Sequence, residues 1–148
     1  MNDLGCTFFG EHDCPDSIEP ILRETIIKLI NRYGVIYFFV GNDGKFDRMV
    51  TKVLKELENY YYDIYISVTL AYFPKNDAEL YDRFTQYPFL TETIPDREAI
   101  DYRDEYMLEN SNYVIAYVTN NRSTAKKYVR KALKENKTVI NLAELIEE

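Results

Sequence analysis

The sequence has no long apolar run and few of the residues that bind metals or form disulfides. No stretch approaches the ~20 apolar residues that cross a bilayer, and residues 1–3 lack the basic and apolar regions of a secretory signal. We therefore expect a cytoplasmic protein with no membrane partner. The chain contains two cysteines, Cys6 and Cys14, and one histidine, His12. Because these are too few for a zinc site or a disulfide framework, we expect two reduced thiols and no bound metal.

Positive charge is also scarce. The net charge is −7, from 25 acidic and 18 basic residues. A surface of this sign repels a polyanion, and no basic stripe that could follow a phosphate backbone is present. Nucleic acid is therefore not an expected partner, although a small phosphate could still bind where the surface is locally positive.

Apolar runs typical of buried strands alternate with segments of helical period. With 148 residues, 46% of them hydrophobic, the chain has enough apolar material for one core. The alternation predicts a single α/β domain over residues 1–148, with a mainly parallel, five-stranded sheet flanked by helices. Strands are expected at residues 4–9, 35–40, 64–70, 113–118 and 138–142, and the first helix is expected to be capped by Ser17. Residues 72–95 are too many for a simple connector and should be partly structured, over the site.

The junction at residues 40–47 links a predicted strand to an amphipathic helix. Gly41 and Gly44 would let the backbone approach a ligand, and the free N–H groups of the following helical turn favour an anion. The junction has neither the Gly-x-Gly-x-x-Gly nor the Gly-Lys-Ser/Thr pattern, so it does not identify a cofactor. A phosphate-binding loop and a purely structural turn are both compatible with it.

Ligands of parallel sheets bind beyond the carboxyl ends of the strands, so polar residues there are candidates. Asn, Ser and Thr can donate hydrogen bonds to phosphate and ribose, and Tyr72 could stack on a base. His12, without a second ligand nearby, is more typical of a polar surface residue. The candidate ligand-binding residues at this edge are Gly10, Gly41, Asn42, Gly44, Phe46, Asp47, Tyr72, Thr119, Asn120, Asn121, Ser123 and Thr124.

Five segments resemble, in the same order, the small proteins of the SLOG superfamily that are related to YpsA. These segments are residues 6–10, 13–18, 40–50, 70–72 and 138–143. The resemblance implies a Rossmann-like, three-layer domain. It also implies kinship with the cytokinin-activating phosphoribohydrolases, also called lysine-decarboxylase-like proteins, and with nucleotide-sensing domains of bacterial conflict systems. The role that it implies is binding of a nucleotide or a nucleotide-derived signal.

Arg103 and Met107 match an Arg and a Met of the helix where, in the related enzymes, the Arg contacts phosphate. The resemblance therefore makes Arg103 the first basic candidate and Arg97 the second. The alternative is that Arg103 pairs with Glu98 or Glu105 on a solvated helix face.

The chain departs from the family pattern at three places. Glu11 follows Gly10 where relatives commonly have His, and Ser123 and Thr124 replace a Gly-Gly pair. Where the enzymes of the family place a catalytic Glu, this chain has Lys126 and Lys127. The sequence therefore offers no carboxylate at the position that the family uses for chemistry.

Together these features favour non-enzymatic binding of a small nucleotide-like ligand, with no certain cofactor. The first alternative is a nucleotide N-glycosidic hydrolase in which Glu11 or Asp47 supplies the carboxylate. The second is a protein-interaction module that uses residues 72–95. The habit of the family and the aromatic content of 15% favour a homodimer.

Overall fold

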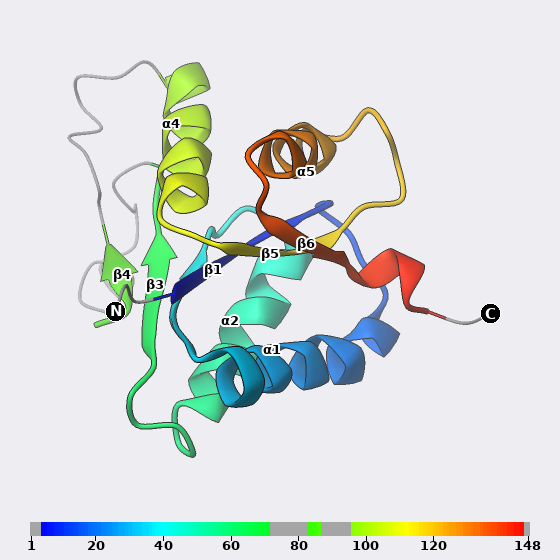
Figure 1. Ribbon diagram of the computed structural model, residues 1–148. Helices are drawn as coiled ribbons and strands as arrows, with labels where there is room; N and C mark the ends of the chain where they lie inside the picture. The colour runs from blue at the N-terminus through cyan, green and yellow to red at the C-terminus, as the bar shows by residue number, and fades with distance from the viewer. Residues whose placement is uncertain (1–3, 72–82, 87–95, 147–148) are drawn as a thin grey trace.

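Strands and helices alternate along the chain (Figure 1). The computed structural model describes residues 4–71, 83–86 and 96–146, but not the side chains of Asp96 and Arg97. In this part of the chain no helix is long and apolar enough to cross a membrane. The elements are β1 (Leu4–Gly10), α1 (Glu19–Tyr33), β2 (Val35–Val40), α2 (Lys45–Leu57), β3 (Tyr65–Thr69), β4 (Thr85–Gln86), α4 (Asp96–Glu109), β5 (Tyr113–Tyr117), α5 (Thr124–Lys134) and β6 (Thr138–Asn141).

The sheet has six strands in the order β4-β3-β2-β1-β5-β6, and every neighbouring pair is parallel. The prediction of a parallel α/β sheet is confirmed, whereas the expected number of five strands is wrong. The sixth strand is β4, in which Thr85 pairs with Val68 and Gln86 with Thr69. A two-residue strand is too short to carry a hydrophobic pattern, so the sequence gives no signal for it.

The beginning of the first helix also differs from the prediction. A short 3-10 turn, Asp16–Ile18, precedes α1, and Ser17 lies inside that turn rather than capping the helix. α1 then ends at Gly34, whose φ of 69° lies in the left-handed region that glycine adopts without strain.

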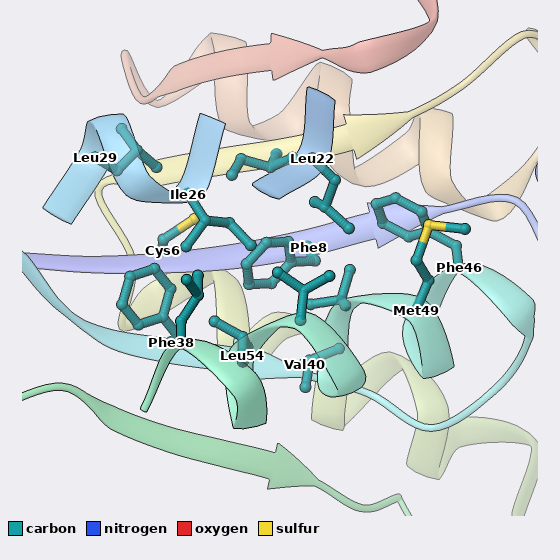
Figure 2. Close-up of a cluster of buried hydrophobic side chains, with 14 of the residues drawn as sticks. Cys6, Phe8, Leu22, Ile26, Leu29, Phe38, Val40, Phe46, Met49 and Leu54 are labelled. Atoms are coloured by element: carbon teal, nitrogen blue, oxygen red, sulfur yellow. The ribbon is translucent and has the colours of Figure 1, made fainter. Parts of the chain in front are cut away.

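Two apolar layers hold the helices against the sheet. α1 and α2 cover one face, and α4 and α5 cover the other (Figure 1). Phe8 and Phe38 point from β1 and β2 into the first layer, where they meet Ile26 and Leu54 (Figure 2). Phe9, one residue further along β1, belongs to the second layer instead. Consecutive side chains of a strand face opposite sides, so a strand buried on both faces must be apolar almost throughout.

The strand order places a crevice between β1 and β5. The chain moves from β1 outward through β2 and β3 to β4, and then returns to the other side of β1 for β5 and β6. The connections that follow β1 and β5 therefore leave the sheet in opposite directions. Such a point of reversal, at the carboxyl ends of the strands, is where open α/β sheets bind ligands.

Candidate functional site

A cavity of about 650 Å³ opens at this point of reversal. Its walls come from the turn after β1, the loop before α2, the turn after β5 and the inner faces of α4 and α5. Ligand pockets of small molecules commonly have ~300–1,000 Å³. Position and size together make this cavity the candidate site.

Nine of the predicted site residues line this cavity. They are Gly10, Glu11, Gly44, Asp47, Arg103, Thr119, Asn120, Ser123 and Thr124. Gly41 and Asn42 instead line a second cavity of about 290 Å³, which Asp47 also borders. Tyr72 and the side chain of Arg97 lie outside the described residues.

Phe46 and Asn121 are not among the described residues that line the main cavity. Asn121 is exposed in the turn after β5. The Phe46 side chain is 1% exposed and stacks on Tyr117, with ring centroids 6.4 Å apart. It also fills the space beside Gly10, where an added Cβ would lie 2.1 Å from the Phe46 ring. Phe46 therefore acts as a core residue beneath the site.

Arg103 reaches the cavity from α4, and it is buried, with only 1% of its surface exposed. Nε donates to Oδ1 of Asp104 at 2.7 Å, and one terminal nitrogen forms an ion pair with Asp43. The other terminal nitrogen lies 3.4 Å from the carbonyl oxygen of Thr69. Each of the three guanidinium nitrogens thus has an acceptor inside the protein.

The alternative pairing of Arg103 with Glu98 or Glu105 is wrong, because the helix turns Arg103 toward the sheet. Ala99, Arg103 and Met107 follow one another at intervals of four residues and are all buried. Glu105 lies on the neighbouring face and pairs with Lys131 of α5 instead.

Glu11 joins the carboxyl ends of β1 and β5. Its Oε2 accepts the backbone N–H groups of Thr119 at 2.9 Å and Asn120 at 2.8 Å, and its Oε1 accepts the Thr119 hydroxyl at 2.7 Å. These hydrogen bonds outweigh the opposing effect of burial and lower the pKa of Glu11. Glu11 is thus an ionised anchor for the turn after β5.

Two carboxyl groups close to Arg103 have raised pKa values. Burial raises the pKa of Asp47 to about 6, although its Oδ2 accepts the N–H of Asp43 at 3.0 Å. Burial likewise raises the pKa of Asp104 to about 6, against the opposing effect of Arg103. Gly41 makes this crowding sterically feasible, because an added Cβ there would lie 2.9 Å from a guanidinium nitrogen of Arg103. The described residues contain no group of three or more acidic, His or Cys side chains placed to hold a metal.

The turn between β5 and α5 is stabilised by its own polar side chains. The Ser123 hydroxyl accepts the N–H of Lys126 at 3.2 Å and donates to the carbonyl of Asn120 at 3.0 Å. The Asn120 side chain accepts the N–H of Arg122 at 2.9 Å. Ser123 therefore caps α5.

The floor of the cavity is apolar and aromatic. Phe9 stacks on Tyr128 with ring centroids 5.1 Å apart, and Ile100 and Met107 complete the surface. The Tyr128 hydroxyl donates to Oδ1 of Asp101 at 2.7 Å, so the buried ring has a satisfied polar end.

Sequence reasoning did not select Tyr128, Asp43 or Asp104 for the site. Tyr128 occupies a core-facing helix position, where an aromatic residue predicts packing alone. Asp43 lies within the recognised junction, and Asp104 follows Arg103 directly. A signal existed for Asp104, which is an acidic residue directly after an arginine expected at a cavity, since a buried guanidinium requires acceptors. No such signal existed for Asp43, which is 60 positions from Arg103.

Comparison with known proteins supports the fold only. No known family matches the sequence, and no curated protein matches it. In three dimensions the chain resembles DNA processing protein A (DprA) from Streptococcus pneumoniae, with a TM-score of 0.71 and 14% identity over 93% of this chain and 49% of that one. It also resembles DNA processing protein A from Helicobacter pylori, which was analysed for its single-stranded DNA binding mode. Here the TM-score is 0.64 and the identity 14%, over 92% of this chain and 63% of the other.

The chain thus spans about half to less than two thirds of these two structures. At this level of identity the likeness concerns architecture, and it confirms the predicted Rossmann-like fold.

Proposed function

We propose that this domain binds a nucleotide or a nucleotide-derived signalling ligand in the cavity between β1 and β5, in the cytoplasm and without transforming it. The observation that carries this proposal is the position of the cavity, about 650 Å³, at the reversal of strand order. Its apolar lining suits a planar base and its polar walls suit a sugar. The kinship with YpsA-related SLOG proteins, which rests on the sequence segments, belongs to the same proposal.

The first experiment identifies what the protein carries. The full chain is purified, denatured, and the released small molecules are analysed by mass spectrometry. We expect a compound that contains a nucleobase, in an amount that approaches one molecule per chain. A preparation that carries nothing, and that binds no nucleoside or nucleotide in calorimetry, would contradict the proposal.

A matched pair of variants tests whether the cavity is the site. Thr124→Trp fills the cavity wall at the start of α5, whereas Thr138→Trp places the same ring at an exposed position where β6 begins. We expect the first variant to lose the released compound and the second to retain it. Equal retention would place the ligand elsewhere on the molecule.

A nucleotide N-glycosidic hydrolase is the second candidate function, and one observation favours it. Asp47 lines the cavity with a pKa raised by burial to about 6, so its carboxyl group could exchange a proton near neutral pH. Glu11, the other candidate, is held ionised by three hydrogen bonds, which suits an anchor better than an acid.

The remaining proposals concern macromolecular partners. One structural relative binds single-stranded DNA, but the net charge of −7 leads us to propose that this chain does not. Fluorescence anisotropy with a labelled oligonucleotide at low salt tests this directly. A homodimer remains a proposal that light scattering of the full chain can test, and the protein-interaction alternative rests on residues 72–95, most of which lie outside the described part.

A further inference from the structure

Three backbone donors at the mouth of the cavity already have acidic partners within the protein. Glu11 accepts the N–H groups of Thr119 and Asn120, and Asp47 accepts the N–H of Asp43. A phosphate bound at a strand-to-helix turn needs such N–H groups, because they stabilise its charge at short range. At these three donors, carboxylate oxygens occupy the positions that phosphate oxygens would need.

Arg103, the buried cation of the cavity, is likewise already paired with carboxylates. Arg103 is paired with both Asp43 and Asp104, and its positive charge also acts on the nearby carboxyl group of Asp47. A phosphate that approached Arg103 would therefore meet like charges at each side, which costs affinity. The other basic side chains among the described lining residues, His12 and Arg122, are exposed at the rim.

The same carboxylates are good acceptors for an uncharged ligand. Sugar hydroxyls and exocyclic amines are donors, and Asp43, Asp47 and Asp104 line the polar wall that faces them. The apolar lining, which includes Ile100 and Ala125, offers surface to a planar ring, whereas Tyr128 is fully buried. Cavity chemistry of this kind, with acceptors on one wall and an apolar lining, matches a base joined to a sugar.

We infer that the ligand is an uncharged nucleoside rather than a phosphorylated nucleotide, and that Glu11 is the residue that excludes phosphate from the turn after β5. This inference rests on the proposed function and narrows its ligand class. Glu11 acts here as a specificity-determining residue, because its carboxylate occupies the anion position in this structure.

Calorimetry on the full chain tests the ligand class. The probes are adenosine, guanosine, cytidine and uridine, each paired with its 5′-monophosphate. We expect at least one nucleoside to bind, and to bind at least about tenfold more tightly than its monophosphate. A monophosphate that binds as tightly as its nucleoside, or more tightly, overturns the inference and leaves the proposed function standing. Failure of all eight probes to bind overturns the inference, and mass spectrometry of the released compounds then tests the proposed function by itself.

A second experiment tests Glu11 without any nucleotide. Inorganic phosphate is titrated while the amide NMR signals of Thr119 and Asn120 are followed in the wild type, in Glu11→Ala and in Glu135→Ala. Glu135 follows α5 at an exposed position, so its variant removes the same charge away from the cavity. We expect saturable shifts at both amides in Glu11→Ala alone.

If Glu11→Ala does not fold, as its amide spectrum would reveal, Glu11→Ser takes its place, because the shorter side chain leaves the anion position open. Saturable phosphate binding at these amides in the wild type overturns the inference. The absence of any gain in the folded Glu11 variant also overturns it.

Discussion

Arg103 of α4 and Asp43 of the loop before α2 form an ion pair, although 60 positions separate them in the sequence. Asp104 binds the same guanidinium at 2.7 Å. This arrangement joins α4 to the carboxyl end of the sheet, so Arg103 is part of the architecture as well as of the cavity wall. The burial of Arg103 contradicts the expectation that a partly solvated ligand-binding arginine would contribute little to folding.

Arg103→Ala should consequently destabilise the fold. The substitution leaves Asp43 and Asp104 without their buried partner, and breaking a buried ion pair in this way typically costs about 3–5 kcal/mol. Urea denaturation of wild type and variant measures the loss. The control is Lys127→Ala, which removes an exposed pair with Asp101 and should change the midpoint far less. An unchanged midpoint for Arg103→Ala would contradict the burial described here.

Asp47→Asn should stabilise the protein at neutral pH. Burial raises the pKa of Asp47 to about 6 in the native state, above the value of ~3.9 for an unfolded Asp. The native state therefore binds more protons between these two pH values, and the free energy of unfolding falls as the pH rises through this window. The destabilisation by the buried, ionised carboxylate of Asp47 is fully present above pH about 6. We expect Asp47→Asn to add about 1–2 kcal/mol to the free energy of unfolding at pH 7.5.

Thermal melts from pH 4 to pH 8 provide the measurement for Asp47→Asn. The variant keeps an oxygen that can accept the N–H of Asp43, so its advantage over the wild type should shrink as the pH falls toward 4. Asp13→Asn, at an exposed position, serves as the control. A constant difference between variant and wild type across the pH range would contradict the raised pKa.

Gly10→Ala should destabilise the core beneath the cavity. The added Cβ would lie 2.1 Å from the buried ring of Phe46, so the ring or the strand must move. Overpacking of this kind costs about 1–3 kcal/mol. The loss should be smaller when Gly10→Ala is made in a Phe46→Leu background, and a double-mutant cycle measures that coupling. Additive changes in the free energy of unfolding would show that Gly10 and Phe46 are not coupled.

The protein should not hydrolyse nucleotides. The first turn of α5 contains Lys126 and Lys127 and no acidic residue, so no carboxylate there can stabilise the positive charge of an oxocarbenium-like transition state, as a Glu does in the enzymes that the sequence resembles. Nucleoside monophosphates, NAD and cyclic nucleotides incubated with the full chain should be recovered intact, as chromatography would show. Steady multiple-turnover release of free base, lost in Asp47→Asn or Glu11→Gln, would favour the hydrolase instead.

The architecture was predictable because its signals are local and repeated. β1 and β2 are apolar enough for burial on both faces, and the spacing of Phe46, Met49 and Val53 assigns α2 its inner face. β4 was not predictable, since a strand of two residues exists only through its pairing with β3. The position of the site edge followed from topology, because the carboxyl ends of parallel strands meet at one edge.

The sequence by itself determined the α/β class, the alternation of elements and the set of polar residues that gather at the carboxyl edge of the sheet. Only the tertiary structure decided how those residues are paired. Glu11 meets Thr119 across 108 positions, and Arg103 meets Asp43 across 60. Periodicity and helix capping depend on neighbours within a few residues, so they can be read along the chain. A buried ion pair depends on the distance between segments that only folding brings together. Whether a backbone N–H group is open to phosphate or already bound to a carboxylate depends on the same distance.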